Sequence, residues 1–333
     1  MQKLISFCIP TLGNHKYISQ TLTSVLNQTK IDDIEIIIGD SSKDNKTKNI
    51  INNFKLKFPN VIYIRIKESK GFDFDFEKTI SHSSGKFCWF LSSDDVLIPG
   101  AIDLIRKELI KNKEVYLFNR LICSLDLKII KKSNRWIVSK KSRNFFFSNN
   151  INCLEYIKLG TSIGCLFSYM SSIVIKKKDW DAIPNYSFFF KKKLFPKAYM
   201  HSLKILSILF KKKTCLRYIA KDLIYFRGDN DSFKKQGYFN RINIDFNGYR
   251  LINELFFKKE NLKSAFQALM RKEHKFYYLL RYRNECSSIK DFRKLIENLK
   301  YYKYPKWQIY FINFFGKSKL VVILLRSLKR SFL

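Results

Sequence analysis

Segments typical of β-strands alternate with segments typical of α-helices over the first 120 residues, and this order constrains the fold more than any other feature. Short apolar runs predict strands at residues 4–9, 34–38, 61–66, 87–91 and 115–119. Helical periodicity and a polar break after each strand predict helices at residues 15–27, 45–54, 73–82 and 99–111. The alternation predicts an α/β fold, a mostly parallel sheet with helices on both faces.

The rest of the chain is less regular. We expect strands near residues 171–175 and 215–226, an amphipathic helix at 197–210, and a largely helical region from about residue 240. No repeat or flexible linker separates these parts. The sequence therefore predicts three regions packed together, with limits at 1–120, 121–240 and 241–333.

Three polar loops follow predicted strands of the first region, at residues 10–12, 39–42 and 92–95. In a doubly wound sheet, ligands bind beyond the carboxyl ends of the strands. We therefore expect these loops to meet at one edge of the sheet and to form the binding site.

Asp94 and Asp95 carry the clearest chemistry among these loops. Adjacent carboxylates at a strand end are unfavourable unless they are solvated, paired or bound to a cation. Mg²⁺ or Mn²⁺ suits one or two carboxylates together with phosphate oxygens and water. The alternative is an acidic pair that only favours the start of the following helix through the helix dipole.

Asp40 and Asp44 lie in the loop after the second strand. A carboxylate there can accept hydrogen bonds from a nucleobase or a ribose, although a turn with a helix N-cap explains the same residues. The sequence has no G-x-G-x-x-G motif and no P-loop motif, and its four histidines lack zinc-site spacing.

The net charge of +35 is unevenly distributed, with about +4 on residues 1–120 and about +31 on residues 121–333. The basic half must therefore face an anionic partner, such as nucleic acid, acidic lipid or a phosphorylated acceptor. A basic nucleic-acid-binding protein is an alternative, but no helix-turn-helix, zinc finger or RNA-binding aromatic motif is present, and we expect no nucleic acid as partner. The seven cysteines form no C-x-x-C pair, and no signal peptide or membrane-spanning run is seen, which favours the cytoplasm.

Together, three segments resemble the family 2 glycosyltransferases of the GT-A fold: residues 6–11 (SFCIPT), 34–44 (IEIIIGDSSKD) and 85–95 (GKFCWFLSSDD). A closer resemblance, to the O-antigen abequosyltransferase group, rests on residues 163–172 (IGCLFSYMSS), 178–183 (KDWDAI) and 226–233 (FRGDNDSF). That group transfers a 3,6-dideoxyhexose from its CDP form to a lipid-linked oligosaccharide. The resemblance implies that residues 1–120 bind the nucleotide sugar, that residues 121–240 bind the acceptor, and that a CDP-sugar is the favoured donor.

The resemblance also implies roles for single residues. Pro10 and Thr11 would line the nucleoside pocket, and Asp40 would contact the base. Asp73 would approach the nucleotide, and Asp94, with Asp95, would hold the metal and the diphosphate.

Two departures from the family pattern affect the chemistry. Ser92 replaces the first aspartate of the usual D-x-D motif, and the Glu-Asp pair that often supplies the general base is not evident near residues 195–199. An inverting transfer needs a carboxylate that takes the proton of the acceptor hydroxyl. Asp229, Asp231 and then Asp181 are the candidates, although a tight turn also explains the first two. Without a base, a retaining mechanism or an inactive relative becomes the alternative.

The C-terminal stretch from residue 301 mixes aromatic and aliphatic residues with Lys and Arg. Such segments suit the headgroup region of an anionic membrane, where each basic residue contributes about 1 kcal/mol. A solvated helix face is the alternative. We expect a peripheral protein on the inner face of the cell membrane, where a lipid-linked acceptor lies.

Overall fold

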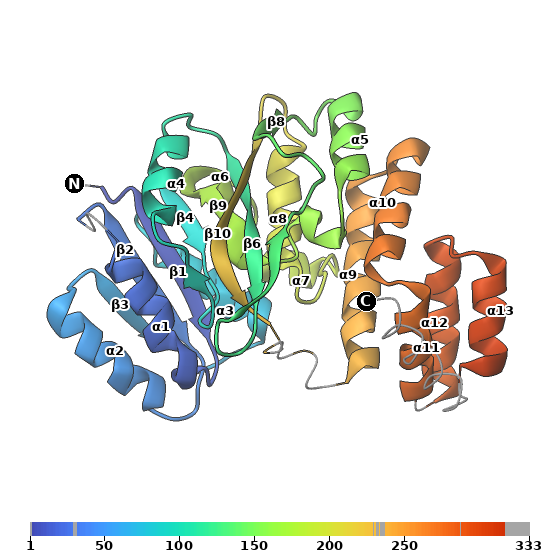
Figure 1. The fold of residues 1–333 in the computed structure, drawn as a ribbon, viewed down its shortest axis with the longest axis horizontal. Helices are drawn as coiled ribbons and strands as arrows, with labels where there is room; N and C mark the ends of the chain where they lie inside the picture. Colours follow the sequence, from blue (N-terminus) through green and yellow to red (C-terminus); the bar gives the residue numbers. More distant parts are fainter. Residues whose placement is uncertain are drawn as a thin grey trace.

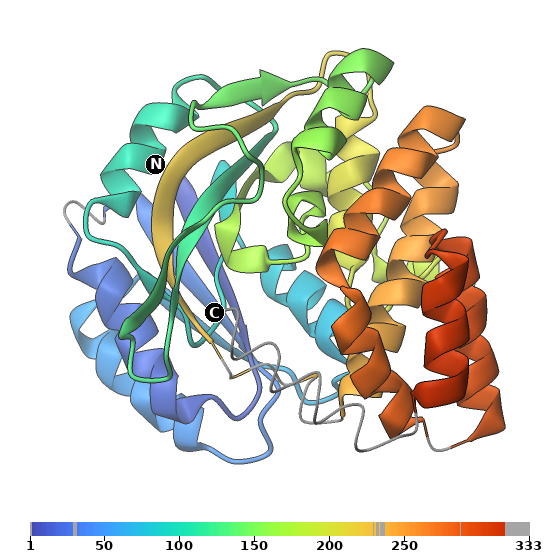
Figure 2. The same ribbon diagram turned by 45° about the vertical axis from the view of Figure 1, so that its right-hand side comes forward.

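The structure is a computed structural model, and it describes residues 2–28, 32–228, 230, 233, 237–286 and 288–316. Of residues 131–134 and 281, only the backbone is described. Figures 1 and 2 show a twisted sheet beside a layer of C-terminal helices.

A ten-stranded mixed sheet forms the centre of the described chain. Its strands are β1 (Ile5–Thr11), β2 (Ile34–Asp40), β3 (Val61–Arg65), β4 (Phe87–Phe90), β5 (Val96–Leu97), β6 (Val115–Cys123), β7 (Ile129–Asn134), β8 (Arg143–Phe145), β9 (Ile173–Lys176) and β10 (Leu216–Arg227). The main order is β3-β2-β1-β4-β9-β6-β10-β5, with β7 beside β6 and β8 beside β10. The β3-β2-β1-β4 part is parallel, and β9 runs antiparallel between β4 and β6.

The helices surround this sheet and extend beyond it. They are α1 (His15–Leu26), α2 (Lys46–Lys57), α3 (Phe72–Ser81), α4 (Ala101–Leu109), α5 (Asn150–Leu159), α6 (Lys177–Asp181), α7 (Tyr186–Lys191), α8 (Met200–Leu209), α9 (Tyr238–Phe256), α10 (Glu260–Glu273), α11 (Phe276–Glu285), α12 (Ile289–Tyr301) and α13 (Lys306–Phe315). Two short 3-10 helices, η1 (Ile163–Leu166) and η2 (Met170–Ser172), precede β9.

Each face of the sheet has its own apolar core. Helices α1, α2 and α4 cover one face, with side chains such as Leu22, Ile51 and Ile105 against β1 and β2. Helix α3 and the helices from α5 onward cover the other, in one cluster that continues from Cys8 to Ile312. The C-terminal helices therefore share a core with the sheet, and the expected α/β fold with helices on both faces is confirmed. The three region limits stay predictions.

Glycine at position 39 lets α3 approach the end of β2. An added Cβ at Gly39 would lie 2.0 Å from Thr79 Oγ1 of α3, so any larger side chain would force the two elements apart. The strand of which Gly39 is part, IEIIIGD, is buried throughout, as a central parallel strand requires. This close packing places the last turns of α3 against the end of β2.

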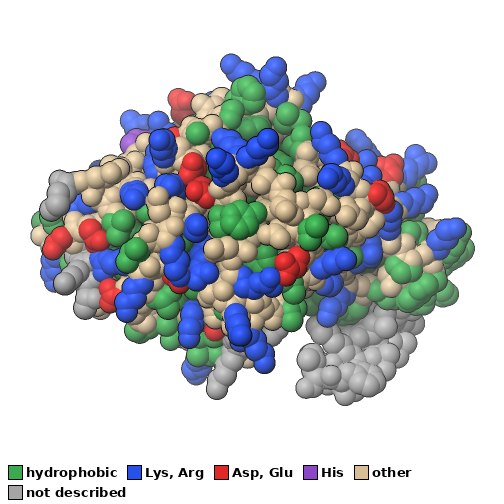
Figure 3. All heavy atoms as spheres, turned by 90° about the horizontal axis from the view of Figure 1, so that it is seen from above, with side chains coloured by type: hydrophobic (Ala, Val, Ile, Leu, Met, Phe, Trp, Pro, Cys, Tyr) green, Lys and Arg blue, Asp and Glu red, His purple; other side chains and the backbone are tan. Residues whose placement is uncertain are grey.

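None of the helices in the described part of the chain combines the length and apolar character that crossing a bilayer requires. Figure 3 shows Lys and Arg side chains spread over one whole face, with few acidic side chains among them.

Candidate active site

The loops after β1, β2 and β4 are joined by hydrogen bonds at the carboxyl edge of the sheet. Ser41 donates its backbone N–H to the Thr11 carbonyl at 3.0 Å, and Gly13 donates to Ser42 Oγ at 2.8 Å. Asn14 Nδ2 donates to Ser93 Oγ at 3.0 Å, which ties the β1 loop to the β4 loop. These three loops form one continuous edge, which we call the rim (residues 10–14, 40–42 and 92–95).

Asp40 is completely buried at the end of β2. Its carboxylate accepts hydrogen bonds from Ser42 N at 2.9 Å and from the Tyr63 hydroxyl at 2.8 Å, and Arg65 Nη1 lies 3.5 Å away. Burial and the Asp40 carboxylate raise the pKa of Tyr63 well above its ordinary value, so the phenol stays a donor. Asp40 therefore fixes the shape of the β2 loop, and its predicted contact with a base stays a prediction.

Arg65 and Asp44 complete this loop. The Arg65 guanidinium donates to the carbonyl oxygens of Ser42 and Asp44, the latter at 2.7 Å. Asp44 Oδ1 accepts the Lys46 backbone N–H at 3.1 Å, which is the turn expected before α2.

Asp73 and Asp75 connect α3 to its surroundings in two directions. Asp73 accepts the backbone N–H groups of Ala198 at 2.6 Å and Met200 at 3.0 Å, and so it caps α8. Burial raises the pKa of Asp73 to about 6, although these two hydrogen bonds oppose the shift. Asp75 accepts from Ser41 Oγ at 2.5 Å, so it bonds directly to the rim, and the sequence had not singled it out.

Asp94 has only neutral partners. One carboxylate oxygen accepts the Ser92 hydroxyl, and the other accepts Asn230 Nδ2 at 2.7 Å. No Lys or Arg among the described residues forms an ion pair with it, although the chain is strongly basic. A carboxylate in this state can still accept a cation.

Asp95 points the other way and is fully occupied. One oxygen accepts the Tyr169 hydroxyl and Ser171 Oγ (2.6 Å), and the other accepts the Arg227 backbone N–H at 3.1 Å. Burial and the neighbouring Asp94 charge raise the pKa of Asp95 to about 7. The adjacent carboxylates thus differ: Asp95 anchors the loop and Asp94 faces the rim.

Arg227 is the last residue of β10, and its side chain holds the β4 loop in place. Its Nε donates to the Asp94 carbonyl at 3.0 Å and its Nη2 to Gln20 Oε1 at 2.5 Å, while the Leu125 carbonyl accepts Nη1. Its guanidinium also lies 4.3 Å from the centre of the Tyr17 ring. Arg227 was missed as a site residue, although it directly precedes the acidic turn in the quoted segment 226–233.

Pro10 and Thr11 lie where the sequence predicts, at the end of β1. Pro10 is paired with Gly39 and Thr11 with Asp40 across the two strands. The Thr11 hydroxyl is buried and has no hydrogen-bond partner among the described residues.

The three candidate bases are not equally placed. Asp229 and Asp231 lie outside the described residues, but Asn230 between them contacts Asp94. Asp181 is half-exposed and pairs with Lys177 at 2.5 Å. Asp181, Trp180 and Lys204 line a cavity of about 630 Å³. None of the predicted nucleotide-binding residues lines this cavity. The three roles stay predictions.

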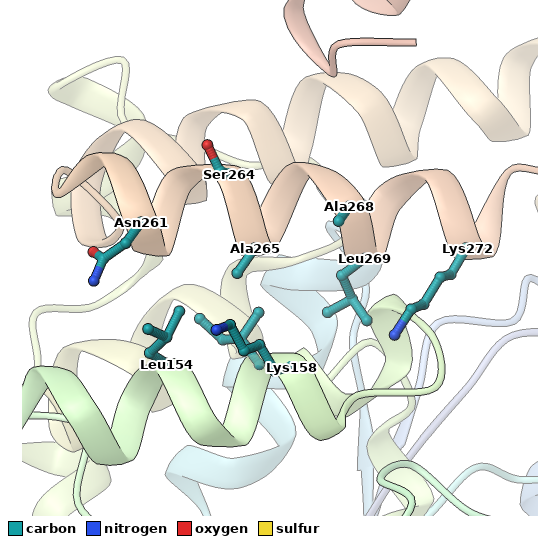
Figure 4. Close-up of a pocket in the computed structure, with 9 residues that line it drawn as sticks. Leu154, Lys158, Asn261, Ser264, Ala265, Ala268, Leu269 and Lys272 are labelled. Atoms are coloured by element: carbon teal, nitrogen blue, oxygen red, sulfur yellow. The ribbon is translucent and has the colours of Figure 1, made fainter. Parts of the chain in front are cut away.

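A second cavity, of about 400 Å³, lies between α5 and α10. Figure 4 shows Leu154, Ala265 and Leu269 facing one another there, with Lys158 and Lys272 beside them. No predicted site residue lines it, so the rim remains the candidate site.

A metal at the rim would depend on few protein ligands. Within the described ranges, no group of three or more His, Cys, Asp and Glu side chains could hold an ion. Asp94 fits as one carboxylate ligand that shares the ion with phosphate oxygens and water, as Mg²⁺ sites commonly do. Asp95 fits a supporting position, since its oxygens already accept three hydrogen bonds.

Comparison with known proteins gives a consistent result. A family model described as glycosyl transferase family 2 matches residues 6–176. Abequosyltransferase RfbV of Salmonella typhimurium is 36% identical over 281 residues, which are 83% of this chain and 82% of that protein.

Solved structures share the fold at low sequence identity. Staphylococcus aureus TarS 1–349 in complex with UDP-GlcNAc has a TM-score of 0.62 at 12% identity, over 98% of this chain and 92% of that one. The mannosyltransferase PcManGT of Pyrobaculum calidifontis, in complex with GDP-Man and Mn²⁺, has a TM-score of 0.50 at 12% identity, over 99% and 87%. With the rim geometry, these findings show that the chain belongs to glycosyl transferase family 2 and is a nucleotide-sugar glycosyltransferase.

Proposed function

We propose that the protein transfers a 3,6-dideoxyhexose such as abequose from a CDP-sugar to a lipid-linked O-antigen oligosaccharide. The likeness to an abequosyltransferase over 83% of the chain supports this donor and acceptor. The observation that carries the proposal is the rim itself, where the Asp94 carboxylate has no cationic partner within the described part of a chain of net charge +35.

Each side of the rim has a role in this proposal. Pro10 and Thr11 contact the nucleoside, with the unpartnered Thr11 hydroxyl available to it. Asp40 shapes the loop that receives the base, and Asp73 holds α8 against the same edge. Asp94 is the protein ligand for Mg²⁺ or Mn²⁺, and Asp95 holds the loop that positions Asp94. When bound, the ion would neutralise the diphosphate charge that develops as the sugar leaves.

The acceptor proton would go to Asp229 or Asp231. Asn230, between them in sequence, donates to Asp94 at 2.7 Å, so the residue that separates the two candidates in sequence lies beside the proposed metal ligand. Either carboxylate would take the acceptor hydroxyl proton as that oxygen bonds to the anomeric carbon and the nucleoside diphosphate leaves from the opposite face, which gives inversion at the sugar. Asp181 is the third candidate; its ion pair with Lys177 and its separate cavity make it the weaker one.

We further propose that the C-terminal helical end (α12 and α13) rests on the inner face of the cell membrane, where a lipid-linked acceptor lies. On α13, Trp307, Tyr310 and Phe314 recur at helical spacing and are 60%, 62% and 75% exposed. The sequence after Glu297 contains no acidic residue and eight Lys and Arg. Aromatic side chains beside basic ones suit an anionic lipid surface.

The experiment that tests the donor is a binding screen of CDP-, UDP-, GDP- and dTDP-sugars with and without Mn²⁺, by calorimetry. We expect a CDP-sugar to bind most tightly and Mn²⁺ to strengthen binding. A wild-type chain that binds no nucleotide sugar would contradict the proposal, and a preference for another nucleotide would overturn the dideoxyhexose assignment.

A further inference from the structure

Arg120 of β6 holds its guanidinium among aromatic rings. The guanidinium carbon lies 3.8 Å from the ring centre of Trp136, 4.4 Å from that of Tyr169 and 4.9 Å from that of Phe226. The three rings come from different parts of the chain: the segment after β7, the residue before η2, and β10. The guanidinium is therefore held between the faces of three aromatic rings.

Two of the three guanidinium nitrogens of Arg120 are buried without a hydrogen-bond partner among the described residues. Nε and Nη1 are buried, and among the described residues no oxygen accepts from either of them. Arg65 and Arg227 near the rim differ, since both donate to several carbonyl or side-chain oxygens. Burial lowers the pKa of Arg120 to about 10, so the group still carries its charge at neutral pH.

A buried, charged donor without an acceptor is unfavourable, because desolvation is not offset by hydrogen bonds. Cation–π contacts recover part of this free energy but leave the N–H groups unsatisfied. A bound anion would satisfy these donors. A planar guanidinium held in one orientation suits hydrogen bonds to phosphate oxygens. Arg120 as a whole is only partly buried.

Arg120 is connected to the β4 loop through the ring of Tyr169. The Tyr169 ring that stacks on its guanidinium donates its hydroxyl to Asp95, the neighbour of Asp94. Across the sheet, Arg120 is paired with Ile224 of β10, three residues before Arg227. A diphosphate shared with an ion at Asp94 would bind beside the same loop.

We propose that Arg120, framed by Trp136, Tyr169 and Phe226, is an oxyanion-binding residue that pairs with a phosphate oxygen of a diphosphate bound at the rim. The proposal rests on the proposed function, because the rim must receive a diphosphate. The diphosphate belongs either to the nucleotide sugar or to the lipid linkage of the acceptor, and both present the same oxygens.

The experiment compares the wild type with Arg120→Met and Arg120→Lys. A matched control is Arg250→Met, which removes an equally charged, ring-stacked arginine that already has Glu254 at 3.1 Å and lies in α9. For each protein we would measure the Tm without ligand, the Kd for CDP and for cytidine with Mn²⁺, and the KM for the lipid-linked acceptor.

We expect Arg120→Met to keep or raise the ligand-free Tm, because it removes a buried cation without an acceptor. It should weaken CDP binding by about 10- to 100-fold and leave cytidine binding unchanged, as loss of a charge-assisted hydrogen bond predicts. Arg120→Lys keeps the charge but not the planar guanidinium, so its Kd for CDP should lie between those of the wild type and Arg120→Met. Arg250→Met should bind CDP as the wild type does. A raised acceptor KM with an unchanged CDP Kd would assign the oxyanion to the acceptor.

A lower Tm with unchanged CDP affinity and unchanged acceptor KM would show a structural cation and overturn the proposal. Equal losses for CDP and cytidine would overturn it too, since they would reflect a collapsed pocket. A wild type that binds no nucleoside diphosphate would mark failure of the proposed function instead.

Discussion

The rim and the C-terminal helical end differ in how they treat charged and aromatic side chains. At the rim, Asp40 and Asp95 are 0% and 1% exposed, and each has at least three fixed partners. On α13, Trp307, Tyr310 and Phe314 are mostly exposed, and Ile312 alone is fully buried among the residues of that helix.

The difference shows how the two regions can be read. A site for one ligand needs side chains held by neighbours, because displacement of a reacting group by about 1 Å can cost about 10²-fold in rate. A surface for a fluid bilayer needs only area and charge, and no single partner fixes its side chains. Substitutions should therefore have specific effects at the rim and graded ones at the helical end.

The largest effect is expected for Asp94→Ala, which should lower sugar transfer by on the order of 10² to 10³-fold. The change removes the carboxylate proposed for the ion, while its neutral partners Ser92 and Asn230 lose little. Steady-state transfer from the best donor, with and without added Mn²⁺, measures this. Asp44→Ala, in an exposed turn of the same edge, is the control. Full activity in Asp94→Ala would rule out the metal assignment.

Arg227→Met should lower the free energy of unfolding by about 3 kcal/mol, because buried acceptors lose their donor. Among them are the Asp94 carbonyl and Gln20 Oε1. Urea unfolding at neutral pH measures the change. Arg250→Met removes an exposed ion pair, so its free energy of unfolding should fall by less than about 1 kcal/mol. Equal losses in both variants would show that the bonds of Arg227 at the rim stabilise the fold no more than an exposed ion pair does.

A double change, Trp307→Ser with Phe314→Ser, should lower partition onto anionic vesicles by about tenfold, since two large apolar side chains lose their burial in lipid. Tm and nucleotide binding should stay unchanged, because both side chains are mostly exposed. Sedimentation with phosphatidylglycerol vesicles, with competitor DNA present, measures it. Leu56→Ser, exposed on α2, is the control. Loss of vesicle binding to competitor DNA would favour nucleic acid as the anionic partner.

The smallest effect concerns the pH dependence of stability. The pKa of Asp73 is about 6 in the folded chain and 3.8 ordinarily, so the folded chain keeps a proton that the unfolded chain has lost between these values. Stability should therefore fall as pH rises from about 4 to about 6, by at most about 1.4 kcal/mol per pH unit from this group. Asp73→Asn should make the fall shallower in urea unfolding at pH 4.5 and 6.5. Identical slopes would show that Asp73 ionises without penalty.

Much of the fold could be predicted because its signals are local. The apolar run Ile34 to Ile38 and the polar turn after it define a strand end, wherever that strand packs. Pro10 and the Asp94–Asp95 pair mark strand ends in the same local way. Parallel strands then bring their carboxyl ends to one edge of the sheet. The additional strands β5, β7 and β8 were not predicted, because they are held by pairing with β6 or β10, and β5 and β8 are also short.

The sequence by itself determined the order of strands and helices, the family, and the loops that form the rim. Only the tertiary structure decided what each acidic or basic side chain does there. Asp73 meets Ala198, 125 residues away, and Arg227 meets Asp94, 133 residues away. Arg120 gains its aromatic frame in the same way. Such contacts follow from packing across the whole core, which no local periodicity or turn preference encodes.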